Sequence, residues 1–332
     1  MVNVAILGAG FMGSAHAANY RALEGRVRVK TVASQTLERA SRVAGSVGAQ
    51  ATTDLNATIR DPEVDAVDIC LPTLLHREMA ERAFAAGKDV FLEKPIALTP
   101  EDADAIIRGA NESGRLFMVG LVLRFWPEYV ELQRLVASTE LGQPLVVSAH
   151  RLSPPADWND WMKDEAQSGG VAVDLAIHDF DQLNWLLGEP RRVFARASRP
   201  GHLVATVEYD RAHGVVEGSM LMPKTYPFSS NIRVLCERGV AEYGFSAAPA
   251  EDGGNIGASD TLRGLRLYPA EGEPTTVDVE SADPWGPEIA YFVECVEQRR
   301  EPEQGTGEQA KKALLVSLAA KRSLETGRPE PV

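Results

Sequence analysis

The chain has few cysteines and lacks the motifs of several common enzyme classes. Its three cysteines, Cys70, Cys236 and Cys295, lie far apart and form no Cys-x-x-Cys pair, so neither a disulfide framework nor a cysteine zinc site is indicated. The sequence also has no His-Glu-x-x-His, Gly-x-Ser-x-Gly or Gly-x-x-x-x-Gly-Lys-[Ser/Thr] motif. Zincin, α/β-hydrolase and P-loop chemistry therefore lack their usual signatures, and we predict no metal site.

Positive charge and long apolar runs are also scarce. The 34 basic and 47 acidic residues give a formal net charge of −13, which would repel a phosphate backbone, so nucleic acid is not an expected partner. No stretch reaches the roughly 18 to 20 apolar residues that a membrane span needs, and no basic segment precedes the first apolar run, Val2–Leu7. We expect a cytoplasmic protein with no membrane partner.

The 332 residues are 44% hydrophobic and 24% charged, as in a soluble globular protein of about two domains. Residues 1–120 alternate apolar runs with amphipathic stretches, which predicts a doubly wound parallel sheet of the Rossmann type. The strands expected there are 2–7, 27–33, 66–71, 90–92 and 116–119, with helices near 12–24, 36–45, 74–86 and 101–113. The last helix opens with Thr99 and Pro100, a cap followed by proline.

Residues 121–332 show a different pattern, which predicts an α+β domain built on a large mixed or antiparallel sheet. Several strands follow one another without intervening helices. We expect them at 145–149, 192–197, 203–209, 214–221, 232–236, 240–243 and 262–268, with helices near 127–138, 170–187, 286–299 and 307–325. The segment from Ala247 to Asp260 is predicted to be a flexible loop.

The strongest local motif is a glycine-rich turn between the first strand and the first helix. In Gly8-Ala9-Gly10-Phe11-Met12-Gly13, the first glycine allows the tight turn, the second lets the backbone approach a pyrophosphate, and the third lets the helix pack closely on the strand. A diphosphate would then lie at the helix N-terminus, near Phe11 and Met12. A glycine turn without a ligand is the alternative, but the βαβ context favours a dinucleotide.

The acidic residue that NAD-binding sites commonly carry after the second strand is missing. Ser34 and Gln35 occupy this place, so nothing repels a 2′-phosphate. Ser34 could donate to such a phosphate and Arg39 could neutralise it, although Arg39 could equally be a solvated helix residue. The cofactor is therefore predicted to be NAD or NADP, with NADP mildly favoured.

Two further groups are candidates for proton transfer and substrate orientation. Glu93-Lys94-Pro95 ends a strand of the parallel sheet, at the edge where such sheets bind ligands, so Lys94 is expected to point toward the cofactor crevice unless it is an ordinary exposed lysine. Asp174 and His178 are four residues apart and share a face of a helix. His178 can move a proton near neutral pH and Asp174 can orient it, although a core histidine would show the same spacing.

The chain resembles the Gfo/Idh/MocA oxidoreductases, which include inositol dehydrogenases and glucose–fructose oxidoreductase. The resemblance covers essentially the whole chain and rests on the glycine turn and three segments: Leu71-Pro72-Thr73-Leu74-Leu75-His76, Ala86 to Pro95, and Ser168 to Asp179. It implies that Lys94 touches the reacting hydroxyl, that Glu93 contacts the nicotinamide ribose, that the Lys94–Pro95 bond is cis, and that His178 is the acid-base residue. Asp179 and Asp181 are expected to support it.

Other residues are weaker candidates. Leu71, Pro72, Thr73 and His76 are expected at the cofactor site because they follow a strand, although His76 could simply cap the next helix. Four residues are candidates for contacting substrate, namely Arg124, Arg151, Trp158 and Trp161. An ordinary linker would explain Arg124, and core packing would explain the indoles equally well.

These observations predict an NAD(P)-dependent oxidoreductase that transfers a hydride between nicotinamide and a sugar, inositol or related polyol. Two alternatives stay open, a dinucleotide-sensing regulator without catalysis and a NAD-dependent glycosidase that uses transient oxidation. A homo-oligomer, dimer or tetramer, is expected because one face of the second sheet would otherwise be uncovered.

Overall fold

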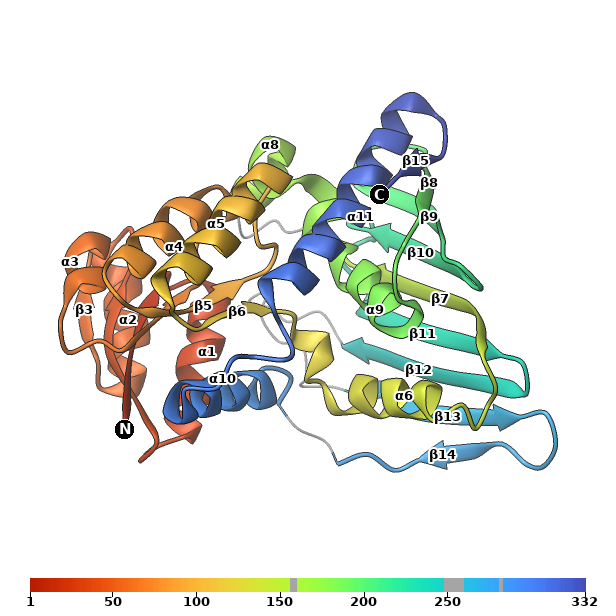
Figure 1. The fold of residues 1–332 in the computed structure, drawn as a ribbon, viewed down its shortest axis with the longest axis horizontal. Coiled ribbons are helices and arrows are strands. Elements are labelled where there is room, and N and C mark those ends of the chain that lie inside the picture. The colour runs from red at the N-terminus through yellow and green to blue at the C-terminus, as the bar shows by residue number, and fades with distance from the viewer. Residues whose placement is uncertain (156–159, 248–259, 281–282) are drawn as a thin grey trace. The chain divides into compact units, whose positions relative to one another are not determined.

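The structure, a computed structural model, describes residues 1–155, 160–247, 260–280 and 283–332 (Figure 1). The chain divides into two compact units, each made of two separate segments. The first comprises Met1–Phe125 and Asp283–Lys311, and the second comprises Trp126–Ala282 and Lys312–Val332. The sequence predicted a single domain boundary at residue 120. The structure places Asp283–Lys311 in the first unit instead, because the pattern of an amphipathic helix does not show on which of two cores the helix packs.

The first unit contains a six-stranded parallel sheet in the order β3-β2-β1-β4-β5-β6, which confirms the predicted Rossmann architecture. The strands are β1 (Val2–Leu7), β2 (Val27–Ala33), β3 (Gln50–Thr52), β4 (Ala66–Ile69), β5 (Asp89–Glu93) and β6 (Phe117–Gly120). The strand order reverses at β1, between β2 and β4. Ligands of open α/β sheets bind outside the carboxyl ends of the strands at such a reversal.

Helices connect these strands, and a later helix completes the first unit. They are α1 (Phe11–Ala22), α2 (Leu37–Val47), α3 (Leu55–Arg60), α4 (His76–Ala85), α5 (Pro100–Ser113) and α10 (Gly286–Gln298), with short 3₁₀ turns η1 (Thr73–Leu75) and η2 (Val122–Arg124). Thr99 caps α5 as predicted, since its hydroxyl accepts a hydrogen bond from the backbone N–H of Asp102 at 3.1 Å. Helix α10 contributes Phe292 and Val293 to the core formed by β1 and α1.

The second unit contains a nine-stranded mixed sheet in the order β14-β13-β12-β11-β7-β10-β9-β8-β15, as predicted. Among the strands of the described residues, β7 and β10 pair in parallel and the other pairings are antiparallel. The strands are β7 (Pro144–Leu152), β8 (Arg192–Arg196), β9 (His202–Glu208), β10 (His213–Ser219), β11 (Phe228–Cys236), β12 (Gly239–Ala247), β13 (Asp260–Pro269), β14 (Thr275–Val277) and β15 (Glu330–Pro331). The loop predicted between Ala247 and Asp260 falls on residues 248–259, which lie outside the described residues.

Helices pack on this sheet. Helix α6 contacts β12 and β13, and α9 contacts β7 and β10. The helical elements of this part of the chain are α6 (Pro127–Ala137), α7 (Asp160–Lys163), α8 (Glu165–Ser168), the π-type turn η3 (Val171–Leu175), α9 (Ile177–Leu187) and α11 (Gly307–Thr326). Among all described residues, no helix combines the length and apolar character needed to cross a membrane.

The helix predicted over residues 170–187 is not continuous. Residues 171–175 form a π-type turn, in which the N–H of Ala176 donates to the carbonyl of Val171 at 2.8 Å, and α9 begins only at Ile177. Gly169 and Gly170, with φ of +80° and +72°, lead into this turn through a backbone conformation that other residues rarely adopt. Asp174 and His178 therefore do not share one regular α-helix, because the hydrogen bond here spans five residues rather than four.

Candidate active site

The glycine turn after β1 has the close packing that its sequence predicts. A Cβ atom on Gly8 would lie 2.2 Å from the carbonyl oxygen of Cys70, and one on Gly13 would lie 1.9 Å from the carbonyl oxygen of Gly8. A Cβ on Gly10 would meet no atom within 4 Å. Gly8 and Gly13 thus allow strand and helix to approach each other, and Gly10 leaves backbone accessible to a ligand.

The N-terminus of α1 is suited to an anion. Its cap residue, Gly10, provides no side-chain hydrogen bond, and the first turn contains no acidic residue. The unpaired N–H groups and the helix dipole therefore favour a negative group there. Phe11 is partly exposed beside this turn, Met12 is half-buried, and the Phe11 ring meets the indole of Trp285 edge-on, with centroids 5.6 Å apart.

The carboxyl end of β2 carries no acidic side chain. Ser34 is buried and its N–H donates to the carbonyl of Thr52 at 3.1 Å, whereas Gln35 is exposed. The Thr36 hydroxyl caps α2 by accepting from the N–H of Arg39, whose side chain is exposed. The Arg39 side chain is thus accessible at the start of α2, as a contact to a phosphate requires.

His76 links the turns that follow β4 and β5. One ring nitrogen lies 2.9 Å from the carbonyl oxygen of Leu71 and the other 2.9 Å from that of Pro95. Burial lowers the pKa of His76. Both nitrogens therefore face backbone, and this histidine holds the two turns together, whereas Pro72 is half-buried and Thr73 is buried between them.

The turn after β5 contains the candidate Lys94. The Lys94–Pro95 peptide bond is cis, which confirms the expectation drawn from the resemblance. Lys94 is half-buried, and its backbone N–H donates to Oε2 of Glu93 at 3.0 Å. Glu93 is buried and packs against Gly120 of β6, where a Cβ would lie 3.4 Å from the carboxyl carbon.

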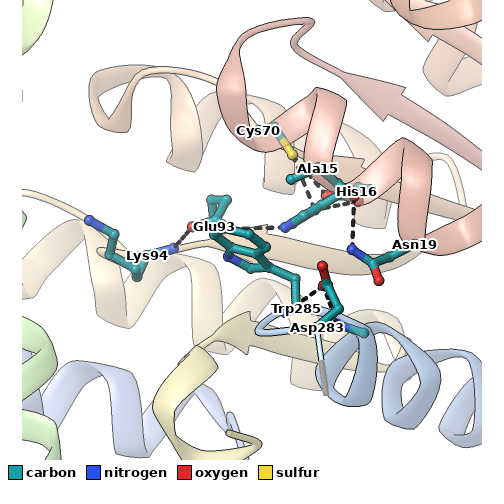
Figure 2. A network of polar contacts seen from close by, with 10 residues as sticks. Ala15, His16, Asn19, Cys70, Glu93, Lys94, Asp283 and Trp285 are labelled. Atoms are coloured by element: carbon teal, nitrogen blue, oxygen red, sulfur yellow. Dashed lines mark hydrogen bonds and ion pairs between the residues drawn. The ribbon is translucent and has the colours of Figure 1, made fainter. Parts of the chain in front are cut away.

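A network of buried polar groups lies next to this turn (Figure 2). His16 of α1 is fully buried, with Nδ1 2.8 Å from Oδ2 of Asp68 and Nε2 3.1 Å from Oε1 of Glu93. The Cys70 thiol lies 3.4 Å from Nδ1 of His16 and 3.3 Å from Oδ1 of Asp68. The imidazole is therefore held between two carboxylates from neighbouring strands.

Burial and charge act in opposite directions on these groups. Burial alone would lower the pKa of His16, but the Asp68 carboxylate outweighs this effect and raises the pKa well above its usual range, which favours the imidazolium form. Burial, assisted by Asp68, raises the pKa of the Cys70 thiol. Burial, assisted by Glu93, also raises the pKa of Glu288 on α10 well above its usual range, which favours its protonated form.

His16, Asp68 and Cys70 are also of the residue types that bind metal ions. The 2.8 Å between Nδ1 and Oδ2 is a hydrogen-bond distance. Two ligands of a tetrahedral zinc ion would lie about 3.3 Å apart, given bonds of about 2.0 Å. The geometry therefore fits a hydrogen-bonded network better than a metal centre.

The second unit contains the predicted acid-base residues. Asp174 is buried in the π-type turn, and His178 is half-buried in the first turn of α9. The next residue, Asp179, is buried and accepts hydrogen bonds at 3.0 Å from both Nε and Nη2 of Arg151. This bidentate ion pair ties the start of α9 to β7 and engages Arg151, a residue predicted to contact substrate.

The remaining candidates are dispersed. Arg124 belongs to η2 of the first unit and is buried, with Nη1 donating to Oε1 of Gln304 at 3.0 Å. Trp161 is half-buried in α7. Trp158 lies outside the described residues. Asp181 is buried in α9.

Sequence reasoning missed His16, Trp285 and Glu288. A signal for His16 was present, because Asp68 is a carboxylate in an otherwise apolar buried strand and requires a partner. Trp285 and Glu288 lie more than 260 residues beyond the glycine turn, and no local pattern connects them with it.

Comparison with known proteins supplies the family. Residues 2–121 match the profile of an oxidoreductase family with an NAD-binding Rossmann fold, and residues 129–242 match the GFO/IDH/MocA C-terminal domain. This chain belongs to the Gfo/Idh/MocA family. The family assignment confirms the resemblance based on the motifs and supports a nicotinamide cofactor for this oxidoreductase.

Relatives with curated names include two inositol dehydrogenases. This oxidoreductase is 34% identical over 200 residues to inositol 2-dehydrogenase of Rhizobium meliloti, which covers 59% of this chain but only 58% of the relative. It is 32% identical over 257 residues to inositol 2-dehydrogenase 4 of Saccharopolyspora erythraea, covering 73% of each chain. The fold also matches the crystal structure of aldose-aldose oxidoreductase from Caulobacter crescentus, with a TM-score of 0.86 and 24% sequence identity. The match covers 100% of this chain and 99% of the other.

Proposed function

We propose that this chain is an NAD(P)-dependent dehydrogenase that moves a hydride between nicotinamide and a carbinol carbon of a sugar, an inositol or a related polyol. The observation that carries the proposal is that Lys94 follows β5 at the same sheet edge where the glycine turn follows β1. A lysine and a glycine turn typical of dinucleotide sites thus follow strands that end at one edge of the sheet. Inositol dehydrogenases among the relatives support the substrate class.

The residues present fit a dinucleotide. The open backbone at Gly10 and the uncapped N-terminus of α1 suit the pyrophosphate, with the N–H groups near Phe11 and Met12 as donors. Residues 71–73 and Glu93 would border the nicotinamide half. The bound nicotinamide supplies the carbon that accepts or donates the hydride.

The chain's own residues would align the substrate and move a proton. In the oxidative direction, we assign removal of the hydroxyl proton to His178 and stabilisation of alkoxide character to Lys94. Asp174 orients or tunes His178. The Arg151–Asp179 ion pair fixes the first turn of α9, so we assign Arg151 to holding that turn.

The choice between NAD and NADP depends on Ser34, Gln35 and Arg39. No carboxylate there repels a 2′-phosphate, and the exposed Arg39 side chain can approach one. Glu38, in the same first turn of α2, opposes this attraction. We therefore propose that both nucleotides are used, with NADP mildly preferred.

We also propose that copies of the chain associate through the open face of the second sheet. Along β9, Leu203, Ala205 and Val207 are buried, whereas Val204 on the opposite face is exposed. Leu235 of β11 is exposed in the same way. These apolar side chains favour a homo-oligomer.

A turnover screen of aldoses, inositols and polyols with NAD and NADP side by side tests the proposed function. We expect a net rise in absorbance at 340 nm that continues with substrate supply. Product formation without a net rise would favour transient oxidation, as in a NAD-dependent glycosidase. Nucleotide binding without turnover of any substrate would favour a regulator.

The variant His178→Ala tests the proton-transfer role. Turnover near neutral pH should fall by about 10²- to 10⁴-fold, because a positioned acid-base group contributes about that factor. The nucleotide dissociation constant, measured by titration of NADH fluorescence, should stay within about threefold. His213→Ala, at an exposed histidine of the same unit, is the matched control, and unchanged turnover in His178→Ala would remove His178 from this role.

A further inference from the structure

His16 has no role in the chemistry described above, yet it occupies a central position in the first unit. It projects from α1, the helix that begins at the glycine turn, toward β4 and β5 (Figure 2). Its ring is completely buried and stacks on Phe91, with centroids 5.3 Å apart and planes at 26°. The ring therefore has a fixed plane and edges that point in defined directions.

Both edges of the ring meet carboxylates. Nδ1 faces Asp68 at 2.8 Å and Nε2 faces Glu93 at 3.1 Å. The Nδ1 contact is a hydrogen bond, whereas the Nε2 contact is an ion-pair distance without hydrogen-bond geometry, so Nε2 and Glu93 interact through charge. Asp68 thereby fixes the ring on one side, and the ring meets Glu93 on the other side.

The Glu93 carboxylate contacts both His16 and the backbone of the next residue, Lys94. One of its oxygens faces His16, and the other accepts the backbone N–H of Lys94 at 3.0 Å. Gly120 lies against the carboxyl group from the neighbouring strand, where a Cβ atom would be in van der Waals contact with it at 3.4 Å. Each oxygen of the carboxylate thus has a polar contact, and Gly120 limits its movement on one side. The backbone N–H of Lys94 is fixed by the same carboxylate.

We propose that His16 is a positioning residue for the reaction, which orients Glu93 and, through Glu93, the backbone of Lys94. This inference rests on the proposed function, because it assumes that Lys94 acts on the substrate oxygen. Its physical basis is that misplacing a reacting group by about 1 Å can cost about 10²-fold in rate. Asp68 belongs to the same device, as the group that keeps the imidazolium in place.

Three variants of the full chain separate this role from simple packing. His16→Phe keeps a stacked ring but removes both N–H groups. His16→Gln also lacks the charge but keeps an amide donor of similar reach. It serves if His16→Phe does not fold, since phenylalanine leaves the buried carboxylates with neither a counter-charge nor a donor. Cys70→Ala is the matched control, because it disturbs the same buried cluster but leaves the contact between His16 and Glu93 intact.

For each variant, kcat, KM and the dissociation constant of NADH are measured, together with the same quantities for Lys94→Met. We expect His16→Phe to lose about tenfold or more in kcat, with the NADH dissociation constant changed by less than about threefold. His16→Gln should recover part of this loss. Cys70→Ala should match the parent chain.

Several results would overturn the proposal. The His16 variants could keep full kcat while Lys94→Met is inactive, or Cys70→Ala could lose as much kcat as His16→Phe, which would indicate packing alone. A stoichiometric metal ion in the purified chain that is lost in His16→Gln would make His16 a ligand. Full kcat in Lys94→Met would instead overturn the proposed role of Lys94, whatever the His16 variants show.

Discussion

Two buried ionisable residues of the first unit, His16 and Glu288, have shifted pKa values that make its stability depend on pH. Asp68 and Glu93 lie on either side of the His16 imidazolium, so the positive charge is shared between two carboxylates. Glu288, from α10, is fully buried, and neither of its oxygens has a hydrogen-bond partner among the described residues. A carboxyl group in such a place is stable only when it is protonated.

The contribution of Glu288 to the free energy of unfolding falls as the pH rises. The pKa of Glu288 is raised in the folded chain above its ordinary value of 4.5, so the folded chain keeps a proton that the unfolded chain releases above that pH. Glu288→Gln has no such proton. Its melting temperature relative to the parent chain should therefore increase from about pH 4 to about pH 8, by thermal unfolding in matched buffers. A difference that is flat or that shrinks with pH would contradict a protonated Glu288.

At the scale of the elements, the β1–α1 turn is the least tolerant part of the fold. The Gly13→Ala variant would place its Cβ 1.9 Å from the carbonyl oxygen of Gly8, so α1 must move away from β1. We predict that the NADH dissociation constant, measured by fluorescence titration, rises at least about tenfold, since the N–H groups of the turn lose their alignment.

Gly45→Ala in α2 is the control for this prediction. No atom lies within 4 Å of its Cβ position, and alanine favours a helix over glycine by about 0.5–1 kcal/mol. Its NADH affinity should be unchanged and its stability slightly higher. Equal affinity in both variants would show that the turn does not bind the nucleotide.

The sequence predicts most elements of this fold but not their fine geometry. The periodicity located β1 and β2 with their observed bounds, because both are apolar runs with clear ends. It missed β3 and α3, whose three and six residues are too short for a periodic pattern. It also predicted an α-helix where η3 forms a π-type turn, since Gly169 and Gly170 impose a backbone that residue propensities do not encode.

At the scale of the whole molecule, the first unit depends on a segment that arrives late in the chain. Phe292 of α10 is completely buried and stacks on Phe91 of β5, with centroids 5.2 Å apart. Phe292→Ala should destabilise the chain by about 3–5 kcal/mol, as expected for a large cavity in a core. Urea unfolding followed by circular dichroism measures this loss, and Leu37→Ala, at a side chain 56% exposed in the same unit, is the control. A loss below about 1 kcal/mol would mean that α10 is not part of that core.

How far apart the residues of the candidate site lie in the sequence explains which of them could be predicted. The glycine turn and Glu93-Lys94-Pro95 are contiguous motifs, so their residues and the cis bond could be anticipated. The partners of Glu93 come from α1 and α10 and become neighbours only when the chain folds. Long-range charge pairing of this kind leaves no periodic signal, apart from the isolated carboxylate of Asp68.

The most direct test of net hydride transfer follows the hydrogen atom that leaves the carbinol carbon of the substrate. The chain is incubated with a carbon-deuterated inositol or aldose that is active in the turnover screen, together with the oxidised nucleotide, and the reduced nucleotide is analysed by mass spectrometry and NMR. Net hydride transfer predicts one deuterium at the nicotinamide C4 for each substrate carbinol oxidised. Deuterium that appears in solvent, or that stays in a product while the nucleotide pool is unchanged, would contradict net hydride transfer.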